Sequence, residues 1–298
     1  MKELSKPRSA KPTFLGVGAQ KCASTWVHRI LDGHPKVSVS DPKELDFFSC
    51  YFDRGYGWYE QFFAGAGHAI AVGETSPSYF YNEAAVERAR AYNPDFKILV
   101  CLRDPIERMY SNHLHEVRKG HIAGADLSFE AGMALNPMYF HQSLYARHLK
   151  KWLAAFGAEN VLVLLQEDIA RDPRAEAARV CAFLGIDADF DSEFFDRRAN
   201  ENVVYKSPAI GAVYGAIGGA ARAVGMGGVI RWAKKTDGVS SIWSAAKENL
   251  RERVAPMRPE TIAALRADLA DDMSALAALL SRADLPWPTW RALTEKAA

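Results

Sequence analysis

The sequence is poor in cysteine, and its few cysteines are scattered. Four occur in 298 residues, at positions 22, 50, 101 and 181, and none forms a CxxC pair. This spacing predicts neither a disulfide framework nor a zinc site, and favours a reducing, cytoplasmic location. An excess of either charge is also missing, because 37 lysines and arginines face 36 aspartates and glutamates. No nucleic-acid partner or anionic membrane is therefore expected, and any anion site must be local.

Long uninterrupted hydrophobic runs are missing too. The first twelve residues are polar and basic without an apolar core, which is unlike a signal peptide and predicts a flexible N-terminus. The longest apolar stretch, Ala209–Ile230, is rich in glycine and interrupted by Arg222. We therefore predict no transmembrane segment. A packed glycine-rich helix or a lid is the favoured interpretation of this stretch, and a membrane contact is the alternative.

The sequence does contain short apolar runs that alternate with amphipathic segments. The runs predict strands at 13–18, 37–39, 69–72, 96–102 and 161–165. The segments between them predict helices at 24–32, 82–92, 105–119, 142–156 and 173–184. Asp104 is expected to cap the third helix, with Pro105 in its first position. The alternation predicts an α/β fold with a P-loop-like parallel sheet, flanked by helices on both faces.

The pattern changes after about residue 187. The polar stretch 189–207 predicts a long functional loop, and helices are expected at 242–253 and 259–282. No internal repeat and no clear boundary is visible. We expect one domain over residues 1–298, with a loop or lid region at 187–240 and a helical C-terminal part at 241–298.

The segment GVGAQKCASTW, residues 16–26, connects the first strand to the first helix. The free N–H groups and the dipole at a helix start favour an anion. Ser24 and Thr25 add hydroxyl groups there, and Lys21 adds a positive charge. A Walker A loop has Gly-Lys-Ser/Thr, but Cys22 stands where its magnesium-binding hydroxyl would be. The alternative interpretation is a structural turn between strand and helix.

Arg103 and Ser111 form a second candidate anion site. Arg103 follows the fourth predicted strand, and Ser111 lies on the next helix, so the two side chains can hold a phosphate from two directions. An arginine with a carboxylate partner is the commoner arrangement. Two separate anion sites, however, suit a nucleotide with phosphates at both ends of its ribose.

Glu74 follows the third predicted strand, between the two anion sites. In an open parallel sheet, ligands bind beyond the carboxyl ends of the strands. Lys21, Glu74 and Arg103 are therefore expected at one edge. A carboxylate placed there can act as a general base, and an ion pair of purely structural role is an equal alternative.

Five segments, in this order and at this spacing, resemble the sulfotransferases that use PAPS (3′-phosphoadenosine-5′-phosphosulfate). The resemblance is strongest to the branch that includes the heparan sulfate N- and 3-O-sulfotransferases and many bacterial enzymes. It covers nearly the whole chain and rests on GVGAQKCASTWVHRILDGHP, DPKELDFF, GETSPSYFY, LRDPIERMYSNH and LQEDIARDPRAEAARVCAFLGI. One departure is Thr75, where the branch often has a lysine after the glutamate.

The resemblance implies transfer of a sulfuryl group from PAPS to a hydroxyl or amine, without a metal. Lys21, at the leaving 5′-phosphate, and Glu74, as the base, are the implied catalytic residues. The implied nucleotide-binding residues are Lys21, Cys22, Ala23, Ser24, Thr25, Trp26, Arg103, Ser111 and Lys206. For Trp26, a place in the core is the favoured alternative.

Two other functions remain open from the sequence: a P-loop nucleotide kinase, and a catalytically inactive nucleotide-binding relative. The acceptor is not determined by the sequence. The resemblance favours a carbohydrate, such as an oligosaccharide, and a lipid or a small-molecule natural product is the alternative. The sequence predicts no oligomeric state.

Overall fold

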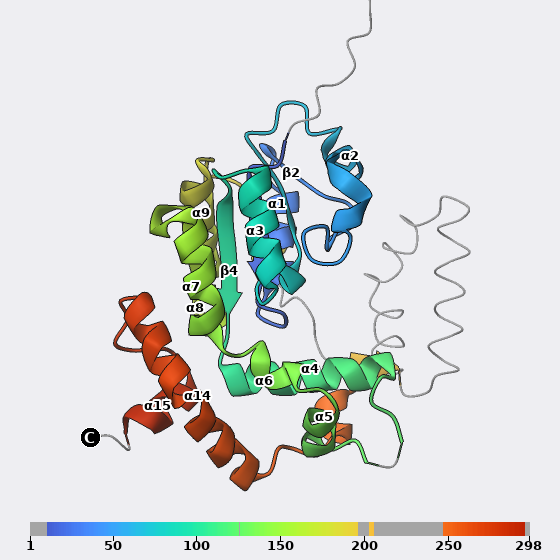
Figure 1. Ribbon diagram of the computed structural model, residues 1–298, viewed down its shortest axis with the longest axis vertical. Helices are drawn as coiled ribbons and strands as arrows, with labels where there is room; N and C mark the ends of the chain where they lie inside the picture. Colours follow the sequence, from blue (N-terminus) through green and yellow to red (C-terminus); the bar gives the residue numbers. More distant parts are fainter. Residues whose placement is uncertain (1–10, 125, 196–202, 206–246, 296–298) are drawn as a thin grey trace, which may run out of the picture. The chain divides into compact units, whose positions relative to one another are not determined.

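The computed structural model describes residues 11–124, 126–195, 203–205 and 247–295 (Figure 1). The chain divides into two compact units. Unit 1 comprises Met1–Asn112, Asn136–Asn200 and Arg258–Ala298, and unit 2 comprises His113–Leu135 and Glu201–Met257. The single domain expected from the sequence stays a prediction.

Unit 1 is built on a sheet of five parallel strands. They are β1 (Phe14–Gly18), β2 (Val37–Val39), β3 (Ala71–Thr75), β4 (Lys97–Leu102) and β5 (Val161–Leu165), in the spatial order β2-β3-β1-β4-β5. Strands covered by helices on both faces must be apolar along their length. Accordingly, β1 and β3 are buried at every position. The predicted parallel α/β architecture is confirmed.

Helices surround this sheet. The elements of unit 1 that follow its strands are α1 (Ser24–Asp32), α2 (Gly55–Glu60), α3 (Glu83–Tyr92), α4 (Pro105–Lys119, which continues into unit 2), α6 (Met138–His141), α7 (Tyr145–Phe156), α8 (Gln166–Arg171) and α9 (Pro173–Leu184). The C-terminal part is helical, as predicted, with α14 (Pro259–Leu279) and α15 (Pro288–Thr294). In Figure 1, α14 and α15 lie side by side. No helix of the described residues has the length and hydropathy needed to cross a bilayer.

The third strand was predicted too early in the chain. It was expected at 69–72, with Glu74 just beyond its end, but β3 spans Ala71–Thr75 and includes Glu74. The strand continues because β1 lies beside it, and Phe14, Leu15 and Gly16 pair with Gly73, Glu74 and Thr75. This pairing partner is non-local and is not visible in the local apolar pattern.

The helix predicted over 142–156 begins only at Tyr145. A separate short helix, α6, ends at His141, and Leu144 is non-helical with φ −77° and ψ 72°. The break has a tertiary cause, because the buried guanidinium of Arg108 donates hydrogen bonds to Gln142 Oε1 at 3.2 Å and to Ser143 Oγ at 2.7 Å. These side chains are held toward Arg108 where a longer helix would pass.

The helix predicted over 242–253 was wrong at its centre. Residues Lys247–Asn249 form strand β7, which pairs antiparallel with β6 (Val203–Tyr205), and among the described residues of this range α13 (Leu250–Arg253) is helical. The loop predicted over 189–207 contains β6 as well. Unit 2 also holds α5 (Phe129–Leu135). The stretch Ala209–Ile230 lies outside the described residues.

Candidate functional site

The loop between β1 and α1 has an unusual backbone. Gly18 has φ +125°, and a Cβ there would lie 2.8 Å from the carbonyl oxygen of Pro77. Lys21 and Ala23 are left-handed, both with φ 68°. Ala23 is the N-cap of α1, and no side chain of the described residues caps this helix start. The first N–H groups of α1 therefore keep their capacity to bind an anion.

The residues of this loop point in different directions. Cys22 is fully buried, its Sγ lies 3.7 Å from Tyr145 Oη, and burial raises its pKa to about 11. Only its backbone can face a ligand. Ser24 is buried, whereas Lys21 and Thr25 are partly exposed. Trp26 is 4% exposed and its Nε1 donates to Phe194 O at 3.0 Å, so it is a core residue. Its contact with a nucleotide stays a prediction.

Arg103 and Ser111 lie at the carboxyl end of β4 and on α4. The Arg103 side chain is 16% exposed and its Nη2 lies 3.2 Å from Glu107 Oε2, while Ser111 is buried. The first loop reaches the same strand end, because Ala19 N donates to Cys101 O at 2.6 Å. Burial raises the pKa of the Cys22 thiol, and the charge of Arg108, the hydrogen bond with Tyr145 and the charge of Arg103 act against that rise, in this order. The two predicted anion sites are therefore neighbours.

Arg108 is a further residue of this site and does not belong to the nucleotide-binding residues predicted from the sequence. Its side chain is fully buried, and Nε, Nη1 and Nη2 donate to Ser143 Oγ, Gln142 Oε1 and Tyr139 O. All three acceptors are neutral, and no carboxylate of the described residues pairs with it. Burial lowers the pKa of Arg108, because removal from water disfavours the charged guanidinium. A buried cation without a counter-ion adds positive potential to the nearby anion sites. Its position one turn before Ser111 was the available signal.

Glu74 is enclosed by the protein. Its side chain is 0% exposed. Oε2 accepts from Ser76 Oγ at 2.5 Å and from Leu45 N at 3.3 Å, and Oε1 accepts from Tyr79 Oη at 2.6 Å. Burial raises the pKa of Glu74 to about 7, against the opposing effect of these hydrogen bonds. In this arrangement Glu74 ties the segment after β2 to β3. Its role as a general base stays a prediction.

The substitution at position 75 leaves Glu74 undisturbed. Side chains at successive positions of a strand point to opposite faces. Thr75 is 1% exposed, and a Cβ on Gly16 would lie 2.7 Å from Thr75 Oγ1. Thr75 therefore packs against β1, away from the hydrogen bonds of Glu74.

A more exposed carboxylate stands next to the tethered Leu45. Glu44 is exposed, is paired with Lys43, and has a left-handed backbone, with φ 66°. Such backbone strain in a residue other than glycine is concentrated at functional sites. Burial, and after it the charge of Lys43, lowers the pKa of His28 on α1 to about 4, and Glu44 is also among the charges that act on His28. This loop thus lies near α1. The motif DPKELDFF contains Glu44, and Asp46 in the same motif is also left-handed, with φ 50°.

Two further sequence predictions concern Lys206 and the absence of a metal. Lys206 lies outside the described residues. Within the part of the chain that the structure describes, no three His, Cys, Asp or Glu side chains gather as a metal site would need. The prediction that no metal is needed stays a prediction.

Comparison with known proteins places this geometry in a family. A family model for the sulfotransferase domain matches residues 11–204. Heparan sulfate glucosamine 3-O-sulfotransferase 6 of Mus musculus is 32% identical over 182 residues, which cover 59% of this chain and 52% of that protein. The bifunctional heparan sulfate N-deacetylase/N-sulfotransferase 4 of Mus musculus is 30% identical over 199 residues, 59% of this chain and 22% of that protein. The matches thus span between about a fifth and about half of these relatives.

A solved structure extends the comparison to the C-terminal part. The crystal structure of a sulfotransferase from Alicyclobacillus acidocaldarius superposes with a TM-score of 0.67 at 26% sequence identity. The superposition covers 93% of this chain and 98% of that one. The likeness therefore extends beyond the 11–204 segment that the family model matches.

Proposed function

The chain belongs to the sulfotransferase family and is a sulfotransferase enzyme, and from this premise we propose that it transfers the sulfuryl group of PAPS to a hydroxyl or amine of a carbohydrate acceptor. One observation carries the choice of donor. Two neighbouring candidate anion sites support it at the carboxyl edge of the sheet: the start of α1 after Lys21, and Arg103 with Ser111. A nucleotide with phosphate groups at its 5′ and 3′ positions fits two such sites.

The residues present suit this nucleotide. The first turn of α1 offers backbone N–H groups without a side-chain cap among the described residues. Helix N-termini of this kind bind phosphate through these donors and through the helix dipole. Arg103 presents a partly exposed guanidinium, and the buried Arg108 adds positive potential. PAPS, when bound, supplies the activated sulfuryl group.

The chain's own residues would position the donor and stabilise charge. Lys21 and the N–H groups of residues 22–25 would stabilise negative charge that develops on the 5′-phosphate, as preorganised donors do. Arg103, Ser111 and Lys206 would hold the 3′-phosphate and affect nucleotide binding more than the rate of transfer. No metal is required in this scheme. We further propose that the chain acts in the cytoplasm and as one domain.

Two carboxylates are candidates for the general base. Glu74 is the candidate from the sequence, but both of its oxygens face protein donors. Glu44 is exposed and can contact an acceptor without rearrangement. The geometry therefore favours Glu44 as the base and Glu74 as the residue that holds its loop. The variant of the true base should lose about 10²–10⁴-fold in kcat, so Glu44→Gln and Glu74→Gln separate the two roles.

The proposed acceptor class rests on the relatives. Two curated relatives carry names that specify heparan sulfate, a carbohydrate. A lipid or small natural product is the alternative acceptor class, and a P-loop kinase is not favoured by the comparisons. PAP formation from PAPS, measured with unsulfated heparan sulfate oligosaccharides, a lipid alcohol and a phenol in parallel, tests the acceptor class.

The test of the donor site is isothermal titration with PAP, the desulfated product, without added metal and beside ATP with Mg²⁺. We expect PAP to bind, and Arg103→Ala to weaken its binding by at least about tenfold, because a charge-assisted contact to phosphate is lost. Arg90→Ala, on the exposed side of α3, is the matched control. Binding of ATP with Mg²⁺ but not of PAP would refute the proposal and support a kinase. Binding of neither would support an inactive relative.

A further inference from the structure

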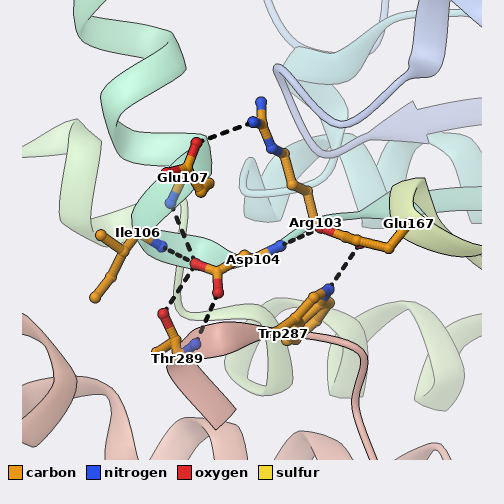
Figure 2. Close-up of polar contacts among 7 residues, drawn as sticks. All are labelled: Arg103, Asp104, Ile106, Glu107, Glu167, Trp287 and Thr289. Atoms are coloured by element: carbon orange, nitrogen blue, oxygen red, sulfur yellow. Dashed lines mark hydrogen bonds and ion pairs between the residues drawn. The ribbon is translucent and has the colours of Figure 1, made fainter. Parts of the chain in front are cut away.

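The carboxylate of Asp104 serves the starts of two helices at once (Figure 2). Its Oδ1 accepts from Ile106 N at 3.0 Å and from Glu107 N at 3.2 Å, which caps α4. The same carboxylate accepts from Thr289, through Oγ1 to Oδ1 and through N to Oδ2, both at 2.9 Å. Thr289 is the second residue of α15. The C-terminal helix is thus fixed to the residue that follows Arg103.

Trp287 makes a parallel connection through Glu167. Glu167 Oε1 accepts from Asp104 N at 3.1 Å, and its Oε2 accepts from Trp287 Nε1 at 2.8 Å. The Asp104 N–H belongs to the peptide bond with Arg103, so this contact holds the backbone from which the Arg103 side chain starts. Trp287 is fully buried and Thr289 is 2% exposed. These hydrogen bonds are therefore shielded from competing water, which makes their loss costly.

The network also fixes the position of the Glu167 carboxylate relative to the Arg103 guanidinium. Burial raises the pKa of Glu167, and the charge of Arg103 is near enough to act against that rise. With both oxygens of Glu167 engaged, its charge is held to the Asp104 backbone and to Trp287. In Figure 2 the Arg103 side chain extends to the other side, toward Glu107. If Trp287 lost its indole N–H, Glu167 Oε2 would be released near the positively charged Arg103.

We propose that Trp287 and Thr289 are positioning residues for the nucleotide: they hold the end of β4 and direct Glu167 away from Arg103, so that Arg103 receives the 3′-phosphate. The inference rests on the proposed function, because it assumes a nucleotide with a 3′-phosphate. Both residues lie outside the 11–204 segment that the family model matches. The C-terminal helix thereby contributes to a site whose proposed contact residues all precede it in the chain.

The test compares two nucleotides that differ only at the 3′ position, PAP and 5′-AMP. Trp287→Phe keeps the aromatic bulk and loses the donor, and Thr289→Val keeps the shape and loses the hydroxyl. Thr289→Ser keeps the hydroxyl and is the conservative rescue. Trp290→Phe and Thr294→Val are the control variants. They remove an indole N–H and a hydroxyl that donate to the backbone carbonyls of Ala283, Trp290 and Arg291. Titration calorimetry gives the affinities, and thermal melting verifies that each variant is folded.

We expect Trp287→Phe and Thr289→Val each to weaken PAP binding about tenfold, the equivalent of losing one hydrogen bond to a charged group. Affinity for 5′-AMP should change by less than about twofold, and Thr289→Ser and the two control variants should bind PAP normally. An equal loss for both nucleotides, or no loss, would overturn the inference while leaving the proposed function intact. Failure of the unmodified protein to bind PAP would overturn the proposed function itself. If Trp287→Phe does not fold, the comparison of Thr289→Val with Thr289→Ser still decides.

Discussion

Replacing Glu74 by glutamine should remove a pH dependence from the stability of the protein. The carboxylate is fully buried in β3, and burial raises its pKa from 4.5 to about 7. Glutamine has nearly the same shape. Its amide oxygen can accept from Ser76 Oγ and Leu45 N, while Tyr79 Oη turns from donor to acceptor. That exchange costs about 0.5–1.5 kcal/mol, at every pH.

The pH-dependent part of the Glu74 contribution to stability follows from its pKa values in the unfolded and in the folded protein. A carboxyl with a higher pKa in the folded state binds its proton more tightly when folded. Its contribution to the free energy of unfolding is fully present below pH 4.5 and is lost as the pH rises through about 7. Between pH 5 and pH 8 this loss amounts to roughly 2–3 kcal/mol. The glutamine variant has no such loss, so its stability relative to the unmodified protein should rise by that amount.

Urea unfolding followed by tryptophan fluorescence measures this difference at several pH values. Other groups titrate in both proteins and cancel in the comparison. Glu87→Gln, which removes an exposed carboxyl on α3, is the matched control. A difference between Glu74→Gln and the unmodified protein that stays constant within about 0.5 kcal/mol from pH 5 to pH 8 would refute the reasoning. It would mean that water reaches Glu74.

Three further predictions concern packing, capping and burial. Gly16→Ala should lower stability by about 1–3 kcal/mol in thermal melts, because its Cβ would lie 2.7 Å from Thr75 Oγ1; an unchanged melting temperature would show that Thr75 moves aside. Asp272→Ala should lower the free energy of unfolding by about 0.5–2 kcal/mol in urea, because Asp272 on α14 accepts from the first N–H groups of α7 at 2.9 and 3.0 Å. The isosteric Asp272→Asn variant should lose less stability than Asp272→Ala, because its amide oxygen can still accept one of these hydrogen bonds. In the folded protein, an aromatic disulfide reagent should label exposed Cys50 rapidly and buried Cys22 only after unfolding; rapid labelling of Cys22 would contradict an inward-facing loop.

The central elements of the fold were predicted correctly because their signals are local. The run FKILVCL predicts a strand buried on both faces, and β4 spans Lys97–Leu102. Asp104 and Pro105 predict the start of a helix, and Asp104 indeed caps α4. The errors arose where distant residues decide. The buried guanidinium of Arg108 interrupts the helix before Tyr145, and the pairing of β6 with β7 replaces helix by strand.

The roles of the predicted site residues stay predictions, but part of their arrangement could be read from the sequence. Spacing along parallel strands brings Lys21 and Arg103 to one edge, and their proximity follows from topology alone. The environment of Glu74 does not follow, because its partners Leu45 and Tyr79 reach it only through the folded loop. The same holds for Glu44, because its residue type does not indicate that its backbone is left-handed.

The sequence by itself determined the order of the five strands of the parallel sheet and of the main helices between them, the two candidate anion-binding segments and the family resemblance, because these depend on apolar periodicity, caps and contiguous motifs. The tertiary structure alone decided which carboxylates are enclosed and which are exposed. It also decided that Trp287 and Thr289, over 180 residues further along the chain, hold the strand end at Arg103. Burial and hydrogen bonding between distant residues are properties of the folded chain, and they determine the pKa of Glu74 and the orientation of Arg103.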